Sequence, residues 1–418
     1  MHTTDDPWQS RYATRTALMV PSEVRALFAV AARPEIISLA GGMPDVGALP
    51  TGVMADLVAA LLTTHGKTAL QYGTAQGDPS LRESICEVMS LEGVAADPDD
   101  VVVTVGSQQA LDLVTRLFVD PGDTVVTEAP TYVTALAVFA AHQARVAQVE
   151  MDEEGVLPGA LSETFARLAA QGRPAKLFYT IPTFHNPTGI TMSARRRQEV
   201  LEVCRRARVL VLEDNPYGLL RYDGESLRPL RASAPDEVIY LGSFSKTLAP
   251  GLRVGWALAP PAVREKLVLA AESAMLSQSP LTQMTVDRYL RTQLWQAQLV
   301  ETCTMYRSRR DAMLRALERY MPPGASWTVP QGGFFVWVSL PEPLDTKAML
   351  DAAVAAGVAY VPGTGFYTGG RGRRELRLSF CYPTPEHVTE GVRRLAAVLQ
   401  DAWEPLSAPH RIPVLSSR

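Results

Sequence analysis

Short apolar runs alternate with amphipathic segments through the middle of the chain. Between residues 101 and 260, runs rich in β-branched residues cover 101–105, 124–127, 176–181, 209–214, 238–242 and 256–259. Apolar residues at helical spacing mark several of the intervening segments, at 108–118, 157–170 and 194–206. Strands that alternate with helices in this way predict an α/β fold, in which a mostly parallel sheet is covered by helices on both faces.

The pattern changes after about residue 290. A long charged helical run extends to Tyr320, and a closing helix runs from Pro385 to about Gln400. Between them lie strand-like segments at 332–340, 358–363 and 375–380 and a helical run at 346–356. This order predicts a smaller α+β domain that follows the large one.

Composition and charge exclude several classes of protein. Hydrophobic residues make up 47% of the chain and charged residues 20%, as in ordinary globular proteins, and the net charge of -4 favours neither nucleic acid nor an anionic membrane as a partner. No apolar run approaches the ~20 residues of a membrane span. The first twelve residues are polar and acidic, unlike a signal peptide, so we expect a soluble cytoplasmic protein. The four cysteines form no CxxC and the histidines no HxxxH, so neither a disulfide framework nor a metal site is expected.

Polar motifs stand where three of the predicted strands end. GSQQ at 106–109 opens a helix after a glycine turn, HNPTG at 185–189 presents an asparagine on a proline-fixed turn, and EDNPY at 213–217 places Asp214 at a strand end. Ligands of parallel sheets bind beyond the carboxyl ends of the strands, and free N–H groups at a helix start bind anions. Each motif alone also fits a helix cap or a simple turn.

A lysine follows the strand at 238–242, in the segment GSFSKTLAPGLRVGW at 242–256. The chain has only five lysines among its 40 basic residues, so Lys246 is conspicuous. Ser243, Ser245 and Arg253 around it suit a dianion. A lysine near such donors and cations can have a depressed pKa and act as a nucleophile, and an arginine could not form an imine.

Together these motifs describe one ligand. It has a phosphate for the GSQQ turn, Ser243, Ser245 and Arg253, a carbonyl that Lys246 can capture, and a basic nitrogen for Asp214. It also has an oxygen that an asparagine and a tyrosine can hold. Pyridoxal phosphate has all four features.

The chain resembles the fold-type-I aminotransferases, and most closely the class I branch that contains 2-aminoadipate and kynurenine aminotransferases. The resemblance covers residues 14–402, and NPTG followed by SKxxxPGxRxG is its most specific part. The strings that carry it are SLAGGMPD (38–45), LQYGTAQGDPSLR (70–82), TVGSQQALDL (104–113), EAPTY (128–132), HNPTG (185–189), EDNPY (213–217), GSFSKTLAPGLRVGW (242–256), GGFFVW (332–337) and LRLSF (376–380).

The resemblance implies a role for each matching residue. Lys246 would hold the cofactor through an imine and then act as general base, and Asp214 would keep the pyridine nitrogen protonated. Arg377 would bind the substrate α-carboxylate beside the backbone of Gly41 and Gly42. The remaining cofactor contacts would be Asn186 and Tyr217 to the ring oxygen, Tyr132 on the ring face, Ser107, Gln108, Ser243, Ser245 and Arg253 at the phosphate, and Tyr72 at the phosphate of a neighbouring subunit, which implies a homodimer.

The fold implied is a large pyridoxal-phosphate-binding domain at 46–288 and a small domain formed by 14–45 and 289–402. We expect an N-terminal arm at 1–13 and a mobile tail at 403–418. The stretch PSEVRAL at 21–27 resembles a mobile helix that closes over substrate, in which Arg25 would contact dicarboxylic substrates unless it is simply a solvated helix residue.

The reaction expected is transfer of the amino group of a 2-aminoadipate, aromatic or branched-chain amino acid to a 2-oxo acid such as 2-oxoglutarate. Two features depart from the family pattern, His185 before NPTG and the pair Asn215-Pro216, and their nearness to the ring leaves the substrate range open.

Three alternatives remain to be weighed. A C–S lyase, cyclase, oxidase or specialised aminotransferase on the same scaffold stays open, because the first chemical steps are shared. A nicotinamide dehydrogenase is disfavoured by the glycine spacing of GTGFYTG at 363–369. A transcription regulator is disfavoured because only about 35 residues precede SLAGG.

Overall fold

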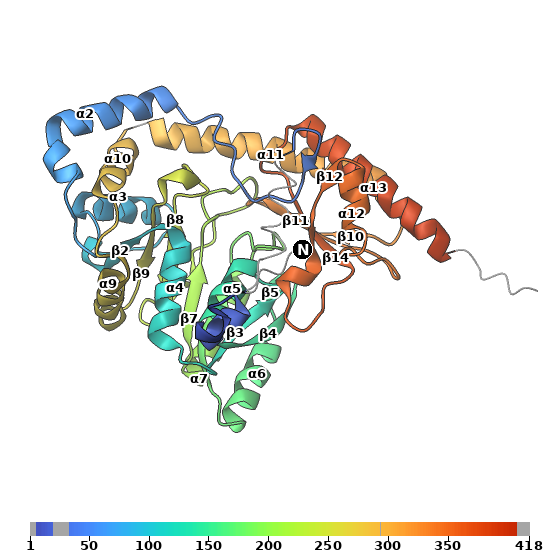
Figure 1. The fold of residues 1–418 in the computed structure, drawn as a ribbon, viewed down its shortest axis with the longest axis horizontal. Coiled ribbons are helices and arrows are strands. Elements are labelled where there is room, and N and C mark those ends of the chain that lie inside the picture. The colour runs from blue at the N-terminus through green and yellow to red at the C-terminus, as the bar shows by residue number, and fades with distance from the viewer. Residues whose placement is uncertain (1–5, 20–32, 293, 408–418) are drawn as a thin grey trace, which may run out of the picture.

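The computed structural model describes residues 6–19, 33–292 and 294–407. Its largest element is a sheet of eight strands in the order β2-β9-β8-β7-β6-β3-β4-β5 (Figure 1). Neighbouring strands from β8 through β7, β6 and β3 to β4 are parallel, whereas β9 runs antiparallel to β2 and β8. The strands are β2 Val101–Thr104, β3 Thr124–Ala129, β4 Arg145–Asp152, β5 Gly155–Val156, β6 Ala175–Thr180, β7 Leu210–Asp214, β8 Val238–Ser243 and β9 Gly255–Leu258.

Helices cover both faces of this sheet. On β6, Leu177 and Tyr179 pack into one hydrophobic cluster with α4, α5 and α9, while Phe178 between them packs into another with α6 and α7. Alternate residues of one strand therefore serve two cores, as expected for a parallel sheet buried on both sides. The helices of this part are α2 Thr51–Ala69, α3 Pro79–Ser90, α4 Gly106–Phe118, α5 Val133–Ala141, α6 Pro158–Ala170, α7 Ala194–Ala207, α8 Leu230–Ser233, α9 Pro261–Met275 and α10 Pro280–Leu290.

A second, smaller sheet lies in the C-terminal part, with strand order β10-β11-β14-β13 (Figure 1). The N-terminal strand β1 pairs in parallel with β12, so residues 37–38 lie with the end of the chain. Helices α11 and α13 pack on a hydrophobic cluster that includes Phe334, Phe335, Leu376 and Leu378. The elements are β1 Ile37–Ser38, α11 Leu294–Tyr320, β10 Ser326–Trp327, β11 Phe335–Ser339, α12 Leu350–Ala355, β12 Val358–Ala359, β13 Val361–Pro362, β14 Glu375–Ser379 and α13 Pro385–Ser407.

The α/β architecture predicted from the sequence is confirmed, with differences in detail. Helix α5 and strand β4 were not predicted, and α13 ends at Ser407 rather than near Gln400. The start of the expected tail, 403–407, is therefore helical, and 408–418 lie outside the described residues. The short 3-10 helix at Thr14–Leu18 contacts α5, and it buries none of its residues, so no apolar pattern encoded its position.

Within the described ranges, no helix is both long and apolar enough to cross a membrane. The cytoplasmic location stays a prediction.

Candidate active site

A cavity of about 330 Å³ lies where several strands of the larger sheet end. Asp214 is the last residue of β7 and Ser243 the last of β8, while Asn186 follows β6 and Tyr132 follows β3. Because β8, β7, β6 and β3 are neighbouring parallel strands, their carboxyl ends meet at one edge. The predicted site residues that line the cavity are Gly42, Ser107, Gln108, Tyr132, Asn186, Asp214, Tyr217, Ser243, Ser245, Lys246 and Arg377.

Lys246 brings a half-buried amine into this cavity. Its Nζ donates a hydrogen bond of 2.8 Å to the Gly42 carbonyl and lies 5.8 Å from the centre of the Phe334 ring. Burial lowers the pKa of Lys246 to about 8. A substantial share of the amine is therefore neutral near pH 8, which is the form that attacks a carbonyl.

Asp214 is a buried carboxylate with one oxygen occupied. Its Oδ2 accepts a 2.8 Å hydrogen bond from the Tyr179 hydroxyl, whereas the buried Oδ1 has no partner among the described residues. Burial raises the pKa of Asp214 to about 6, against the opposing effects of the Tyr179 hydrogen bond and the Lys246 charge. The free oxygen can accept a hydrogen bond from a ligand.

Arg377 is held between two aromatic rings. On β14, its guanidinium carbon lies 4.1 Å from the centre of the Phe335 ring and 5.1 Å from that of Phe366. Its Nη1 donates to Asn186 Oδ1 and its Nη2 to the Ala40 carbonyl, both at 2.8 Å. Among the described residues its buried Nε has no partner, so a planar cation with a free donor faces the cavity wall.

Hydrogen-bond donors gather at another part of the cavity. Ser243 Oγ lies 2.9 Å from Ser245 Oγ, and Arg253 reaches Ser245 Oγ at 3.4 Å and the Val105 carbonyl at 3.0 Å. Ser107 and Gln108 stand in the first turn of α4, whose N–H groups are free to bind an anion. Gly106, with φ of 75°, permits this packing because a Cβ there would lie 2.6 Å from Arg253 Nη2.

Tyr217 and Gly42 are two further predicted residues that line the cavity. The Tyr217 ring packs edge-on against Phe334 and Phe335, with centroids 5.4 and 6.0 Å apart, and burial raises its pKa well above the usual value, so it stays a protonated donor. A Cβ at Gly42 would lie 2.8 Å from the Phe335 ring. Gly41 lies next to it, and its carbonyl is 3.5 Å from Cys381 Sγ.

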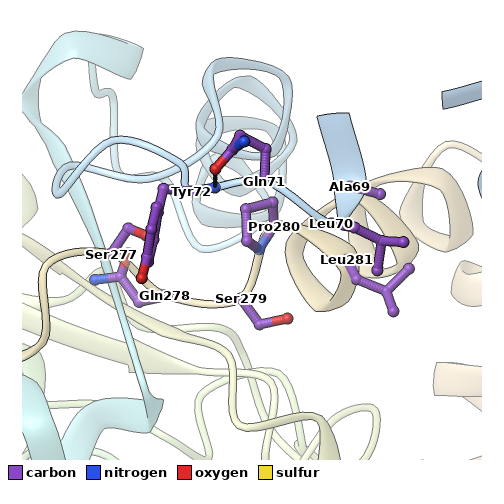
Figure 2. Close-up of a pocket in the computed structure, with 9 residues that line it drawn as sticks. All are labelled: Ala69, Leu70, Gln71, Tyr72, Ser277, Gln278, Ser279, Pro280 and Leu281. Atoms are coloured by element: carbon purple, nitrogen blue, oxygen red, sulfur yellow. Dashed lines mark hydrogen bonds between the residues drawn. The ribbon is translucent and has the colours of Figure 1, made fainter. Parts of the chain in front are cut away.

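Three of the predicted residues that the structure describes, Gly41, Tyr72 and Arg253, do not line this cavity. Gly41 precedes Gly42, and Arg253 lines an adjoining surface pocket with Val105 and Gln108. Tyr72 is 76% exposed and lines a separate surface pocket with residues 69–71 and 277–281 (Figure 2). Arg25 lies outside the described residues.

Of the two departures from the family pattern, Pro216 of the pair Asn215-Pro216 lines the cavity, whereas the His185 and Asn215 side chains turn away from it. His185 Nε2 lies 3.1 Å from Glu128 Oε2, and Asn215 donates to Glu92 Oε1 at 2.9 Å and to the Tyr240 hydroxyl at 3.0 Å. Neither His185 nor Asn215 lines the cavity, because buried carboxylates behind the sheet edge bind their side chains.

Among the residues of the site that were not predicted, four contact predicted residues or the backbone beside them. Tyr179 binds Asp214, Phe335 and Phe366 flank Arg377, and Cys381 Sγ lies 3.1 Å from the Met43 carbonyl beside the Lys246 acceptor. Phe335 stands within the quoted GGFFVW string, but the other three carry no local signal, because a buried tyrosine, phenylalanine or cysteine in a strand or loop reads as core.

The donor set fits pyridoxal phosphate. The orphaned Asp214 Oδ1 matches a protonated ring nitrogen, the serines, Arg253 and the α4 N-terminus match a phosphate, and the Lys246 amine matches the aldehyde. Within the part of the chain that the structure describes, no group of three or more His, Cys, Asp or Glu is placed to hold a metal ion.

Comparison with known proteins supports the same cofactor. The family model "Aminotransferase class I and II" matches residues 34–395. The chain is 42% identical over 394 residues to aromatic-amino-acid aminotransferase 1 of Thermococcus litoralis, and the match covers 94% of this chain and 94% of the relative. It is 37% identical over 398 residues to the 2-aminoadipate transaminase of Thermus thermophilus, covering 94% of this chain and 97% of the relative.

A solved structure is also similar throughout. Kynurenine aminotransferase of Pyrococcus horikoshii, crystallised in complex with PMP, superposes with a TM-score of 0.89 at 40% identity, covering 94% of this chain and 98% of that chain.

Proposed function

The chain belongs to the class I and II aminotransferases, which use pyridoxal phosphate, and on this premise we propose that it transfers the amino group of an aromatic, branched-chain or 2-aminoadipate-type amino acid to 2-oxoglutarate. One observation supports this most directly. Lys246, Asp214 and Arg377, from three distant segments, line a single cavity of about 330 Å³.

Pyridoxal phosphate, when bound, supplies an electron sink that lets the Cα–H bond of an amino acid break as a proton. Asp214 Oδ1 would accept a hydrogen bond from the protonated ring nitrogen and so keep it protonated. Asn186 Oδ1 already accepts a hydrogen bond from Arg377, so the amide nitrogen of Asn186 is left to donate to the ring oxygen. The Tyr217 hydroxyl would donate to the same oxygen. Tyr132 would cover the ring face, and the phosphate would take Ser107, Gln108, Ser243, Ser245 and Arg253.

Lys246 would both attach the cofactor and carry the proton. Its pKa of about 8 keeps a usable neutral fraction, and the Gly42 carbonyl 2.8 Å away orients the amine. A base must lie within hydrogen-bond reach of the proton it takes, and Lys246 is the amine that lines this cavity.

Arg377 would bind the α-carboxylate shared by every substrate. Its two terminal nitrogens are already anchored by Asn186 and Ala40, and its Nε is free, so the guanidinium is fixed before substrate arrives. Gly41 and Gly42 would let the substrate approach the backbone closely, since Gly42 has no room for a Cβ. Met43, Pro44, Val133 and Phe335 line the rest of the cavity and suit an apolar or aromatic side chain.

The choice of 2-oxoglutarate as acceptor rests on the resemblance of residues 21–27 and on the proposed contact of Arg25 with a distal carboxylate. Arg25→Ala should then raise KM for 2-oxoglutarate far more than for pyruvate. Equal effects on the two acceptors would remove Arg25 from the site.

We propose further that two copies of the chain form the active enzyme, with Tyr72 of one reaching the phosphate site of the other. Leu70 and Tyr72 are 73% and 76% exposed, and both line the surface pocket of Figure 2, so a second copy of the chain could cover these large side chains. Sedimentation should show a dimer, and Tyr72→Phe should weaken cofactor binding without changing assembly. A monomer with full activity would overturn this proposal.

A single half-reaction tests the proposed chemistry. Holoenzyme is mixed with one amino acid and no oxo acid. Transamination releases one equivalent of the matching oxo acid and converts the cofactor to its amine form. Continuous release of ammonia with an unchanged cofactor would contradict the proposal and indicate a lyase or oxidase.

A further inference from the structure

A buried tyrosine lies directly behind the proposed ring-nitrogen partner. Tyr179 is on β6, next to β7, which ends at Asp214, and its side chain is fully buried. Its hydroxyl donates to Asp214 Oδ2 at 2.8 Å. Tyr179 does not line the cavity, so it would act on a ligand only through Asp214.

The ring of Tyr179 is held firmly in the core. Phe139 of α5 packs edge-on against it, with centroids 5.7 Å apart and an interplanar angle of 75°. Both residues belong to the hydrophobic cluster between the larger sheet and its helices. The packed ring therefore fixes the position of the Tyr179 hydroxyl, and the hydrogen bond from this hydroxyl fixes the Asp214 carboxylate.

The direction of the hydrogen bond is set by chemistry. Burial and the charge of Asp214 raise the pKa of Tyr179 well above its usual value, so the tyrosine keeps its proton and is the donor. A donor to the ionised form of a carboxyl favours that form, which opposes the effect of burial on Asp214. Two groups favour the ionised form of Asp214, namely the neutral Tyr179 hydroxyl through its hydrogen bond and the Lys246 amine through its charge.

We infer that Tyr179 is a positioning residue for transamination: it fixes Asp214 through Oδ2 and keeps it ionised, so that Oδ1 is presented to the ring nitrogen of the cofactor. This inference rests on the proposed pairing of Asp214 with that nitrogen, and it adds an element that holds the pair in place.

The variant Tyr179→Phe removes one oxygen and keeps the ring. Loss of a hydrogen bond to a charged group should lower kcat about 10- to 100-fold and weaken cofactor binding to a similar degree. KM for the amino acid should change less than about threefold, because Arg377 and not Asp214 would bind its carboxylate. The nitrogen-15 resonance of ring-labelled pyridoxal phosphate should move toward that of a neutral pyridine.

Tyr240→Phe is the matched control. Tyr240 is 1% exposed on the neighbouring strand β8, but its hydroxyl contacts Asn215 and Glu92 instead of Asp214. Tyr240→Phe should leave kcat and the cofactor dissociation constant within about twofold of the wild-type values. Its nitrogen-15 shift should equal that of the wild type. Thermal unfolding of both apoproteins shows whether either variant is misfolded.

The double variant Tyr179→Phe/Asp214→Asn separates the possible failures. If Tyr179 acts through Asp214, its removal should add less than about twofold to the loss caused by Asp214→Asn alone. A nitrogen-15 shift in Tyr179→Phe equal to that in Tyr240→Phe, or an undiminished loss in the Asp214→Asn background, would overturn the inference. If Asp214→Asn itself changes neither the shift nor kcat, the proposed cofactor pairing fails, and the inference fails with it.

Discussion

Replacing Arg377 with lysine tests how the substrate carboxylate is bound. The guanidinium has three fixed contacts, to Asn186 Oδ1 and the Ala40 carbonyl at 2.8 Å each and to the Phe335 ring at 4.1 Å. A lysine keeps the charge but has a single nitrogen, so it cannot maintain these anchors and also bind a carboxylate with two parallel hydrogen bonds.

The size of the effect follows from the geometry. A carboxylate bound by Nε and one terminal nitrogen makes two charge-assisted hydrogen bonds, and lysine retains at most one. Each such bond contributes about 1.5–3 kcal/mol. With about 1.4 kcal/mol per factor of ten, kcat/KM should fall about 10- to 100-fold.

The assay compares two substrates in the half-reaction followed by cofactor absorbance. L-phenylalanine has the α-carboxylate, and 2-phenylethylamine is the same molecule without it. Arg377→Lys should slow the reaction of the amino acid and leave the slower reaction of the amine nearly unchanged. Their difference isolates the carboxylate contact from any general damage to the site.

Arg310→Lys serves as the control, since Arg310 is also buried and donates to the Pro330 carbonyl, but does not line the cavity. An equal loss for both substrates, or a loss in Arg310→Lys as large as that in Arg377→Lys, would refute the carboxylate assignment.

Three further predictions follow from buried groups. The rate at which added cofactor attaches to the apoprotein should rise with pH and level off above about pH 8, because burial lowers the pKa of Lys246 to about 8 and only the neutral amine attacks. Stopped-flow absorbance measures this rate, and a constant rate over about two pH units around pH 8 would contradict the prediction. Cys381→Ala should lower kcat/KM about two- to tenfold by freeing the Met43 carbonyl, whereas the buried Cys204 replaced by alanine should have no effect. Burial raises the pKa of Glu92 from 4.5 to about 7, so between these pH values the folded protein binds more protons than the unfolded chain and loses stability as pH rises. Glu92→Gln should abolish this loss, which is on the order of 3 kcal/mol. An equal change in melting temperature between low and neutral pH in both proteins would disprove the prediction.

The large sheet was predictable because its central strands are buried on both faces. Such strands read as continuous apolar runs, and the polar residue that ends each strand, such as Asp214 or Ser243, marks the sheet edge. Strand β4, RVAQVEMD, was missed because the strand predictions followed continuous apolar runs, and its partly buried residues form none. Helix α5 was missed because nearly all of its nine residues are apolar, which leaves no helical period to detect.

The site was predictable only as far as motifs follow strands. Contacts between distant segments could not be predicted from the sequence, because they depend on how the two sheets pack. Arg377 and Asn186 are 191 positions apart and meet only in the folded chain. Tyr179 lies inside a strand whose residues are all expected to be core, so nothing in its local sequence distinguishes a hydroxyl that binds Asp214 from one that merely fills space.

Arg377 and Lys246 belong to separately packed parts of the protein. The neighbours of Arg377 on β14, Leu376 and Leu378, lie in the cluster of the smaller sheet, whereas Leu241, just before Lys246 along the chain, lies in that of the larger sheet. A substrate whose carboxylate binds Arg377, and whose nitrogen takes the place of Lys246 on the cofactor, would span the junction. The spacing of two hydrophobic cores, and not a side-chain pocket, would then decide how many carbon atoms separate those two groups, so that α-amino acids fit and β-amino acids, one carbon longer, do not.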